Sequence, residues 1–499
     1  MAPSAILFLT LSELGQATVS LAVAHEFLIR SYDVHIGSFA PLETAVSTLN
    51  IRAASLSSVT NRATFHPLTG PPMAEVIRYS NISKDSFAVH KVGFRAALST
   101  YKHILPILAT SWDGPQYMAI YQDCSTLIRT LQPAIVVLDP LFLQAVDACR
   151  MLEQRYVVLS PNTFKELTVQ PRLASLWKYP IMGSGYPYPL PWYLILPNVY
   201  LALRMPLILM SDPRARELMA YRTAQGLPRA TSAQIIQQLN KDKIVFLIPT
   251  RRETEIPCYF PGNFTLCGPI LRPCSPIAEE DPELAAWLGR RPTVLVNLGS
   301  HVMYTIDVLQ ELMEGFRMLL DKRPDVQILW KIKPSSGAKL DDTTLPNNLR
   351  TAIAEGQVRV EPWLAVEPIG ILTSGHVECM VHHGGSNSYH EAIRAGVPQV
   401  ILPVWLDTYD FALRAEWLGI GIWASRKTAP GVNGPELGQA LIRVLASSQS
   451  ESIRHQAQAI ATNLGPKDGR VIACEKIISL LTEPCSTKCT GEGKSASVY

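Results

Sequence analysis

The residues best suited to chemistry lie in one run, Val381 to Asp407, which reads VHHGGSNSYHEAIRAGVPQVILPVWLD. An apolar strand ends at His382, and two glycines then let the backbone turn. A helix is expected to begin at Ser386 or Asn387, because serine and asparagine cap helices well. The free N–H groups of a first helical turn attract anions, and His383 stands beside them. This order of residues predicts a diphosphate site.

Two carboxylates follow the expected helix start. Glu391 comes four residues after Asn387, so both side chains face one side of the helix. Gly396-Val397-Pro398 ends the helix, and the next strand leads to Asp407. A carboxylate on the helix suits a ribose diol, and one at the strand end suits the hydroxyls of a sugar. The run therefore predicts a site for a sugar joined to a nucleoside diphosphate.

These residues need a scaffold that brings several strand ends together. Strand patterns in the second half cover 293–297, 326–332, 358–362, 378–382, 399–404 and 419–424, with helical patterns at 307–320, 387–395 and 409–417. This alternation predicts a parallel sheet with helices on both faces. Ligands bind beyond the carboxyl ends of such strands. Gly299, Ser300, Trp363 and Asp407 each follow a strand, so we expect them to share one binding floor.

The first half predicts a second domain of the same class. Strand patterns at 6–9, 33–37, 134–139, 156–160 and 244–248, a loop at 12–16 and a helix at 17–30 give a βαβ opening. The Pro/Gly-rich stretch 257–282 is expected to link the halves. We place the domains at 1–270 and 271–460, followed by a helix within 461–482 that packs back and a disordered tail at 483–499.

At this point the residues carry a family resemblance. The segment 358–411 resembles the donor-binding signature of family 1 glycosyltransferases, which use uridine-diphosphate sugars and have the GT-B fold of two facing Rossmann-like domains. The residues that match are Trp363, His383, Gly385, Asn387, Ser388, Glu391, Gly396-Val397-Pro398, Pro403 and Asp407. Asp407-Thr408-Tyr409-Asp410 and the segment 176–209 are most similar to soluble fungal members.

The resemblance implies a role for each matched residue. Trp363 would stack on uracil, the backbone near Leu364 would pair with its edge, Glu391 would hold the ribose, and Asp407 would hold the sugar. The diphosphate would lie against Ser300, His383, Asn387 and Ser388, and Gly15, Gly385 and Ser386 complete the expected donor set. Thr408 replaces the glutamine that usually contacts the sugar hydroxyls, although glucose remains the expected sugar.

Inverting transfer also needs a group that accepts the acceptor's proton. Family members usually place a histidine after the glycine of the first loop, but here Gly15 is followed by Gln16, whose amide is not a base near neutral pH. His25 lies about half a helical turn out of phase with Gln16, so it faces away. Asp139, at a strand end, is the first candidate base, and Glu13 is the second. An acceptor that arrives ionised, such as a carboxylate or a phenol, would need no base.

The segment 176–209 reads LWKYPIMGSGYPYPLPWYLILPNVYLALRMPLIL. Its six prolines are expected to break regular structure and to forbid a membrane-spanning helix. Three interpretations stay open: an irregular packed insertion, an apolar wall for a lipophilic substrate, and a surface that rests on a membrane.

Composition excludes several other classes of protein. The chain has 499 residues, 47% of them hydrophobic and 17% charged, which excludes disorder. With 45 Lys and Arg against 42 Asp and Glu, nothing favours a nucleic-acid partner. No apolar run reaches the roughly 18–20 residues of a membrane span, and the N-terminus lacks the basic region of a signal peptide. Nine cysteines without a Cys-x-x-Cys indicate free thiols and a cytoplasmic location, with peripheral membrane contact left open.

Two functions of different class fit these observations. The first is an inverting glycosyltransferase that moves a sugar to a hydroxyl or carboxyl of a small lipophilic acceptor, such as a secondary metabolite, a sterol or a phenolic. It would use no metal or other cofactor, because a helix N-terminus and His383 can offset the negative charge of the departing diphosphate. The alternative is a nucleotide-sugar-binding protein that has lost transfer, which Gln16 keeps open. Epimerisation of the donor sugar is a third reading, which the apolar segment disfavours mildly.

Overall fold

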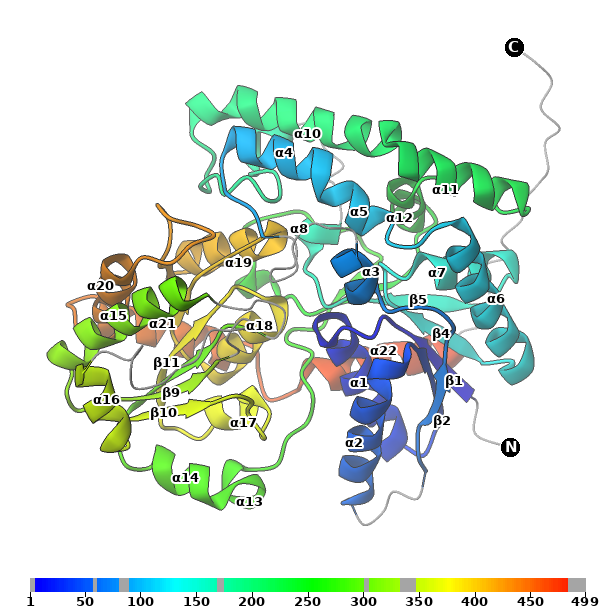
Figure 1. The fold of residues 1–499 in the computed structure, drawn as a ribbon. Helices are drawn as coiled ribbons and strands as arrows, with labels where there is room; N and C mark the ends of the chain where they lie inside the picture. Colours follow the sequence, from blue (N-terminus) through cyan, green and yellow to red (C-terminus); the bar gives the residue numbers. More distant parts are fainter. Residues whose placement is uncertain are drawn as a thin grey trace.

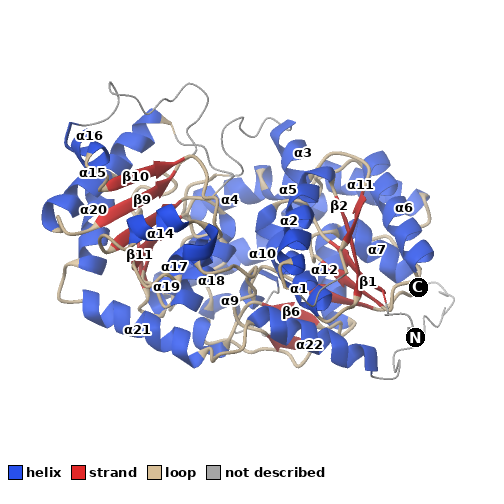
Figure 2. Ribbon diagram, turned by 90° about the horizontal axis from the view of Figure 1, so that it is seen from below, coloured by secondary structure: helices blue, strands red, loops and turns tan. Residues whose placement is uncertain are grey.

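The chain folds into two domains, each a parallel β-sheet with helices on both faces (Figures 1 and 2). The computed structural model describes residues 5–56, 61–79, 89–167, 175–299, 305–332 and 347–482. The expected class, two parallel α/β domains, is confirmed. Ser300 and the tail 483–499 lie outside the described residues.

The first sheet has the strand order β3-β2-β1-β4-β5-β6-β7, and every neighbouring pair is parallel. Its strands are β1 (Ala5–Leu9), β2 (Asp33–Ser38), β3 (Thr64–Pro67), β4 (Ile135–Leu138), β5 (Tyr156–Leu159), β6 (Phe246–Ile248) and β7 (Phe264–Leu266). The central strands read as continuous apolar runs because helices cover both faces. Their carboxyl ends all point to one edge of the sheet, where the loops after β1 and β4 are neighbours.

The helices of this domain are α1 (Leu14–Ile29), η1 (Ala40–Leu42), α2 (Glu43–Ala54), α3 (Met73–Tyr79), α4 (Phe94–His103), α5 (Leu105–Ala109), α6 (Gly114–Leu131), α7 (Leu143–Met151), α8 (Phe164–Leu167), α9 (Ser175–Lys178), η2 (Trp192–Leu194), α10 (Ile195–Ser211), α11 (Pro213–Ala224), α12 (Ser232–Lys241) and η3 (Arg252–Thr254). The expected loop at 12–16 is wrong in its second part. The Glu13 carbonyl accepts from the N–H groups of Gln16 and Ala17, at 2.7 and 2.9 Å, so the helix starts at Leu14. Gln16 therefore stands on the first turn of a helix, where its position is fixed.

The second sheet has the order β10-β9-β8-β11-β12-β13, again all parallel. The strands are β8 (Thr293–Asn297), β9 (Gln327–Lys331), β10 (Val358–Glu361), β11 (Val377–His382), β12 (Gln399–Ile401) and β13 (Gly421–Trp423). The helices are α13 (Ile277–Glu280), α14 (Pro282–Leu288), α15 (Ile306–Lys322), α16 (Asn347–Ala354), α17 (Pro368–Leu372), α18 (Ser386–Ala395), α19 (Leu406–Trp417), α20 (Gly434–Leu445) and α21 (Ser450–Asn463).

The last helix, α22 (Gly469–Thr482), leaves the second domain and packs on α1 of the first (Figure 1). Ala473 and Ile477 join the buried cluster beneath α1 and β1. Arg470 pairs with Glu26 of α1 at 2.9 Å. The chain thus crosses between the domains twice, and this second crossing fixes them to each other on the side of α1.

The proline-rich segment 176–209 is not irregular throughout, so that expectation is wrong. Its second half is part of α10, in which Pro197 lies in the first turn, where the backbone N–H has no partner within the helix. Pro206 lies inside the helix and removes one hydrogen bond without ending it. Among the described residues, Trp192–Ser211 is also long and apolar enough to cross a membrane by length and composition. Counting prolines missed this because their positions, not their number, decide whether a helix survives.

Candidate active site

The N-terminus of α18 lies where the sequence predicts an anion site. The N-cap residue is Gly385 rather than Ser386 or Asn387, and no side chain caps the first turn. That turn also carries no acidic residue. The turn before the helix is held by His382, whose Nδ1 accepts from the Gly384 N–H at 3.0 Å. Backbone donors and the positive end of the helix dipole are therefore left to a ligand.

His383 is fixed at the entrance to this helix. A Cβ on Gly299 would lie 2.7 Å from the His383 ring, and one on Gly385 would lie 2.5 Å from it, so both positions must be glycine for the ring to fit. Trp405 packs edge-on to the ring, with centroids 5.6 Å apart. His383 thus stands between the ends of β8 and β11, beside the first turn of α18.

Two side chains in the first turn of α18 bond to the first domain. The Asn387 amide donates to the Leu14 carbonyl at 3.2 Å, and the Ser386 hydroxyl donates to the Pro161 carbonyl at 2.5 Å. Leu14 follows β1 and Pro161 follows β5. The carboxyl ends of both sheets therefore face each other, and the cleft between them holds the predicted site.

On the first-domain side of the cleft, Asp139 follows β4 and is 1% exposed. Its Oδ1 accepts from the Leu141 N–H at 2.9 Å. Burial raises the pKa of Asp139 to about 7, while hydrogen bonds from the Leu141 and Leu11 N–H groups and from Thr10 oppose the rise. The charge of Glu13 adds to the rise. A carboxyl with this pKa can exchange a proton near neutral pH.

Glu13 and Gln16 lie on the adjacent loop and helix start, after β1. Burial raises the pKa of Glu13 above its ordinary value, and its Oε1 accepts from the Ala74 N–H at 2.7 Å. Gly15 is exposed, with open space where a Cβ would be, so a ligand can approach the backbone there. His25 is buried within α1, and burial lowers its pKa.

Glu391 lies on α18, one turn after Asn387, and is 8% exposed. Burial raises its pKa to about 8, and the charge of Glu367 adds to the rise. Arg272 and Lys331 oppose it. Burial therefore favours the protonated form of Glu391, and a protonated carboxyl can both donate to and accept from a ribose diol.

Lys331 is a site residue that the sequence patterns did not single out. It ends β9 and is largely buried, with Nζ 3.1 Å from the Gly299 carbonyl and 4.3 Å from the centroid of the Trp363 ring. The Trp363 ring is half exposed, so one face carries the lysine while much of the ring still meets solvent. Leu364 is buried among core residues, which leaves only its backbone to face a ligand.

Asp407 and Thr408 stand in the first turn of α19, after β12. Thr408 is fully buried, and its hydroxyl lies 3.0 Å from both the Val404 and the Trp405 N–H groups. It therefore shapes the turn that presents Asp407 rather than pointing at a ligand. His90, from the other domain, accepts the Leu406 N–H through Nε2 at 2.8 Å. Nothing in the sequence spacing indicated this contact, which joins residues 316 positions apart.

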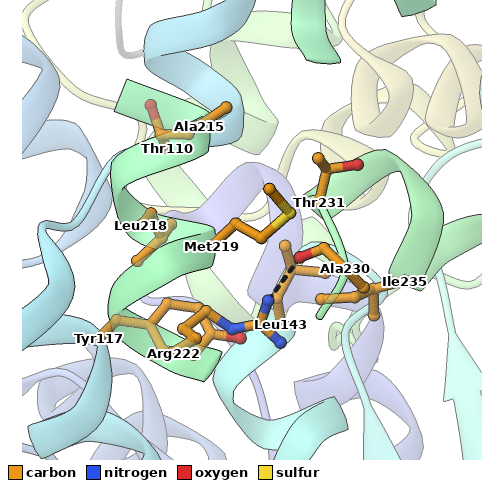
Figure 3. Close-up of a pocket in the computed structure, with 10 residues that line it drawn as sticks. All are labelled: Thr110, Tyr117, Leu143, Ala215, Leu218, Met219, Arg222, Ala230, Thr231 and Ile235. Carbon is orange, nitrogen blue, oxygen red and sulfur yellow. Dashed lines mark hydrogen bonds between the residues drawn. The ribbon is translucent and has the colours of Figure 1, made fainter. Parts of the chain in front are cut away.

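Two cavities lie elsewhere. The pocket in Figure 3 encloses about 10 Å³, room for about one water molecule, and Tyr117 and Arg222 line it. Arg222 is already paired with Asp147 there. A cavity of about 510 Å³ lies near the crossing of α22, but its arginines, Arg272, Arg394 and Arg470, are each paired with a carboxylate. Neither cavity includes Asp139 or His383, so the cleft is the stronger candidate.

Two solved structures share this architecture over almost their whole length. The glycosyltransferase of kitacinnamycin matches 96% of this chain and all of its own, with a TM-score of 0.60 and 18% identity. A UDP-glucosyltransferase from Polygonum tinctorium that glucosylates indoxyl matches 97% of this chain and all of its own, with a TM-score of 0.63 and 15% identity. The fold is therefore that of the GT-B glycosyltransferases.

Sequence comparison then gives the family. Residues 333–467 match the family described as erythromycin biosynthesis protein CIII-like, C-terminal domain. Glycosyltransferase sdnJ of Sordaria araneosa is 35% identical over 507 aligned positions, which cover 95% of this chain and 97% of the relative. The chain belongs to the family 1 glycosyltransferases, and the suspected resemblance is confirmed. The alternative, a nucleotide-sugar-binding protein that has lost transfer, is not favoured, because a relative that aligns over almost its full length is named a glycosyltransferase.

Proposed function

We propose that this enzyme transfers a sugar, most simply glucose, from a uridine-diphosphate donor to a hydroxyl or carboxyl of a small lipophilic acceptor, with inversion. The observation that carries the proposal is the uncapped first turn of α18, which meets the loops after β1 and β5. A diphosphate placed on that turn lies between the two domains, so the bond to be broken faces the first domain. The helix dipole and His383 stabilise the charge of the departing diphosphate, so the proposal includes no metal ion.

The donor residues keep the roles that the family resemblance implies. Uracil stacks on Trp363, the ribose lies against Glu391, and the diphosphate lies against His383 and the first turn of α18, to which Ser300 and Ser388 are added. The sugar is held by Asp407. Thr408 acts on the sugar only through the turn that it caps.

In the proposed step the acceptor oxygen attacks the anomeric carbon while the bond from that carbon to the diphosphate breaks. The acceptor proton passes to a carboxylate, and uridine diphosphate leaves with the electron pair. Asp139 is the proposed base, with Glu13 as the second candidate. The raised pKa of Asp139 supports this role, because a base with a pKa near the working pH gives the largest rate.

The lipophilic character of the acceptor is proposed from the apolar segment 176–209 of the first domain, which indicates a chemical class and no particular molecule. A reducing compartment is supported by the seven described cysteines, all of them free thiols. Burial holds the pKa of Cys267 and Cys474 at about 12, so these thiols stay protonated and unreactive.

The test pairs an alcohol with the carboxylic acid of the same skeleton, such as decanol and decanoic acid, each with UDP-glucose and with a chelator present. We expect product by mass spectrometry, and micromolar binding of uridine diphosphate but not guanosine diphosphate by calorimetry. Asp139→Asn should slow transfer to the alcohol by roughly 10²–10⁴-fold, while transfer to the ionised acid is spared. Glu13→Gln tests the second candidate base in the same assay. Equal losses for both acceptors would assign Asp139 a structural role, and failure of the chelated enzyme would overturn the metal-free mechanism.

A further inference from the structure

The solvent-facing side of α10 is apolar along its whole length. Leu196 is 81% exposed, and Tyr200, Leu203, Leu207 and Met210 are between 46% and 55% exposed. These positions are spaced by four and three residues, so they form one stripe on the helix. The preceding η2 extends the stripe, because Trp192 is 83% exposed.

The buried side of the same helix is, in contrast, partly polar. The Asn198 side chain is buried and ties α10 to the preceding segment through the Ile181 N–H and the carbonyls of Leu176 and Tyr179. Folding therefore placed an amide inside and a row of large apolar side chains in contact with water. A contiguous surface of this kind marks a site of interaction.

The charged residues of the two segments that build this layer all have one sign. The two segments that build this layer, 89–112 and 175–211, contain five Lys or Arg residues and no Asp or Glu. Among them Lys91, Arg95, Lys102 and Lys178 are exposed, and none of the four forms an ion pair within the described residues. The acids next in sequence, Asp113 and Asp212, are used as helix caps.

We propose that this surface, the α10 stripe together with the exposed cations of segments 89–112 and 175–211, docks the enzyme on a membrane that carries anionic lipids. A helix with one apolar face and cationic flanks lies in the plane of the interface, its apolar side chains below the headgroups and its cations beside the phosphates. A second copy of the chain is a poorer occupant, because a symmetric contact would bring the same cations against each other. The positive charges therefore favour anionic lipid over a second copy of the chain as the partner of this surface.

The helix lies on the membrane rather than crossing it. Leu201 and Ile208 of α10 share a buried cluster with Tyr101 of α4, and α10 packs along α4 and α9. Inserting α10 across a bilayer would break this cluster and the Asn198 hydrogen bonds. Figure 1 shows α4 and α10 side by side along the top of the molecule, above α8 and α19. Because the exposed residues of the stripe lie along one face of a single helix, they can meet a flat surface together.

The docked surface is joined to the site through His90. The His90 N–H donates to the Val404 carbonyl at 3.1 Å, just before the turn that carries Asp407, and α4 begins four residues later. The layer that meets the lipid is therefore bonded to the strand end beside the cleft. This step rests on the proposed transfer function: the arrangement would admit a lipophilic acceptor from the bilayer. The docking itself does not depend on transfer and is tested without substrate.

The experiment is sedimentation of the full chain with phosphatidylcholine vesicles, with and without phosphatidylserine. We expect binding to the anionic vesicles that falls with salt. Leu203→Glu with Leu207→Glu should abolish it, whereas the matched control Ile51→Glu, on an exposed residue of α2 far from α10, should not change it. Arg95→Glu with Lys102→Glu should weaken binding at least about fivefold for each cation removed. This second pair is exposed and polar, so it tests the proposal even if the leucine pair fails to fold.

Three results would overturn the proposal. One is no sedimentation of folded protein with anionic vesicles. Another is equal loss in the Ile51→Glu control, which would mean that binding is not localised to α10. The third is a concentration-dependent dimer in light scattering that the leucine pair abolishes while vesicle binding persists, which would assign the stripe to a second copy. Transfer to a water-soluble acceptor, assayed in parallel, separates a failed surface from a failed enzyme.

Discussion

Replacing Asp139 by asparagine should make the protein more stable at neutral and alkaline pH. The folded protein holds a proton on Asp139 up to about pH 7, whereas the unfolded chain releases it near the ordinary pKa of 3.8. Between these values the unfolded state binds fewer protons, so the free energy of unfolding of the wild type falls as the pH rises. The rise in pKa is worth about 4 kcal/mol, at about 1.4 kcal/mol for each pH unit. The amide of the Asp139→Asn variant would carry no such penalty, and its side-chain oxygen can still accept the Leu141 N–H.

The measurement is a series of urea unfolding curves from about pH 4 to about pH 8 for both proteins. The difference, Asp139→Asn minus wild type, should rise through this interval and level off above about pH 7 at a few kcal/mol in favour of the variant. Glu355→Gln, at an exposed acid, is the control and should give a flat difference. When Asp139→Asn is compared with its parent in a Glu13→Gln background, the rise in the difference should end at a lower pH. The reason is that the Glu13 charge helps to raise the pKa of Asp139.

A flat difference for Asp139→Asn would refute the reasoning, as would a wild type that is the more stable protein at pH 8. Either result would mean that the fold holds Asp139 as a stabilised anion. Such an anion would be a weak base, so the proposed proton transfer to Asp139 would fall with it. The same variant thus tests the electrostatics without substrate and the mechanism with it.

Two further predictions concern the cleft and the domain contact. Gly385→Ala places a methyl group about 2.5 Å from the His383 ring, so the ring must move, and we expect calorimetry to give roughly tenfold weaker binding of uridine diphosphate with little change in Tm. Arg414→Met leaves Glu255 buried without the guanidinium that it meets at 2.5 Å, and urea unfolding should show a loss of about 3–5 kcal/mol. Unchanged binding in the first variant, or a loss below about 1 kcal/mol in the second, would contradict these assignments.

The strand, the turn and the helix start of the expected donor side could be predicted because their signal is local. A strand, two glycines and a helix start fall within a few residues of one another, and the physics of a helix N-terminus needs no distant partner. The exact cap was missed, since Gly385 takes that position and frees Ser386 to reach Pro161 of the other domain. A short motif therefore predicts the local backbone and the class of ligand expected there, while the facing domain decides which side chains remain free.

The parts that could not be predicted depend on residues far apart in the sequence. In the sequence, Lys331 is the polar end of an apolar strand, and His90 is one histidine in a stretch without a clear helical or strand pattern. Their roles arise only when the sheet brings Lys331 beside Trp363 and when packing of the two domains brings His90 to the start of α19. No sequence motif could predict either contact, because the number of residues between the two partners does not determine whether they meet.

The helix α10 shows a different limit. Its residues are mostly apolar, so the period of the pattern could not tell which face would be buried. The one polar residue in its first half, Asn198, would be placed on the outside by any rule based on hydrophobicity, yet it is buried because three backbone groups of residues 176–181 lie within its reach. The free energy gained by hydrogen-bonding those backbone groups outweighs the free-energy cost of exposing Leu196 and Leu203. The apolar outer face is thus a consequence of hydrogen bonding on the inner face, and the proposed contact with lipid would satisfy both faces at once.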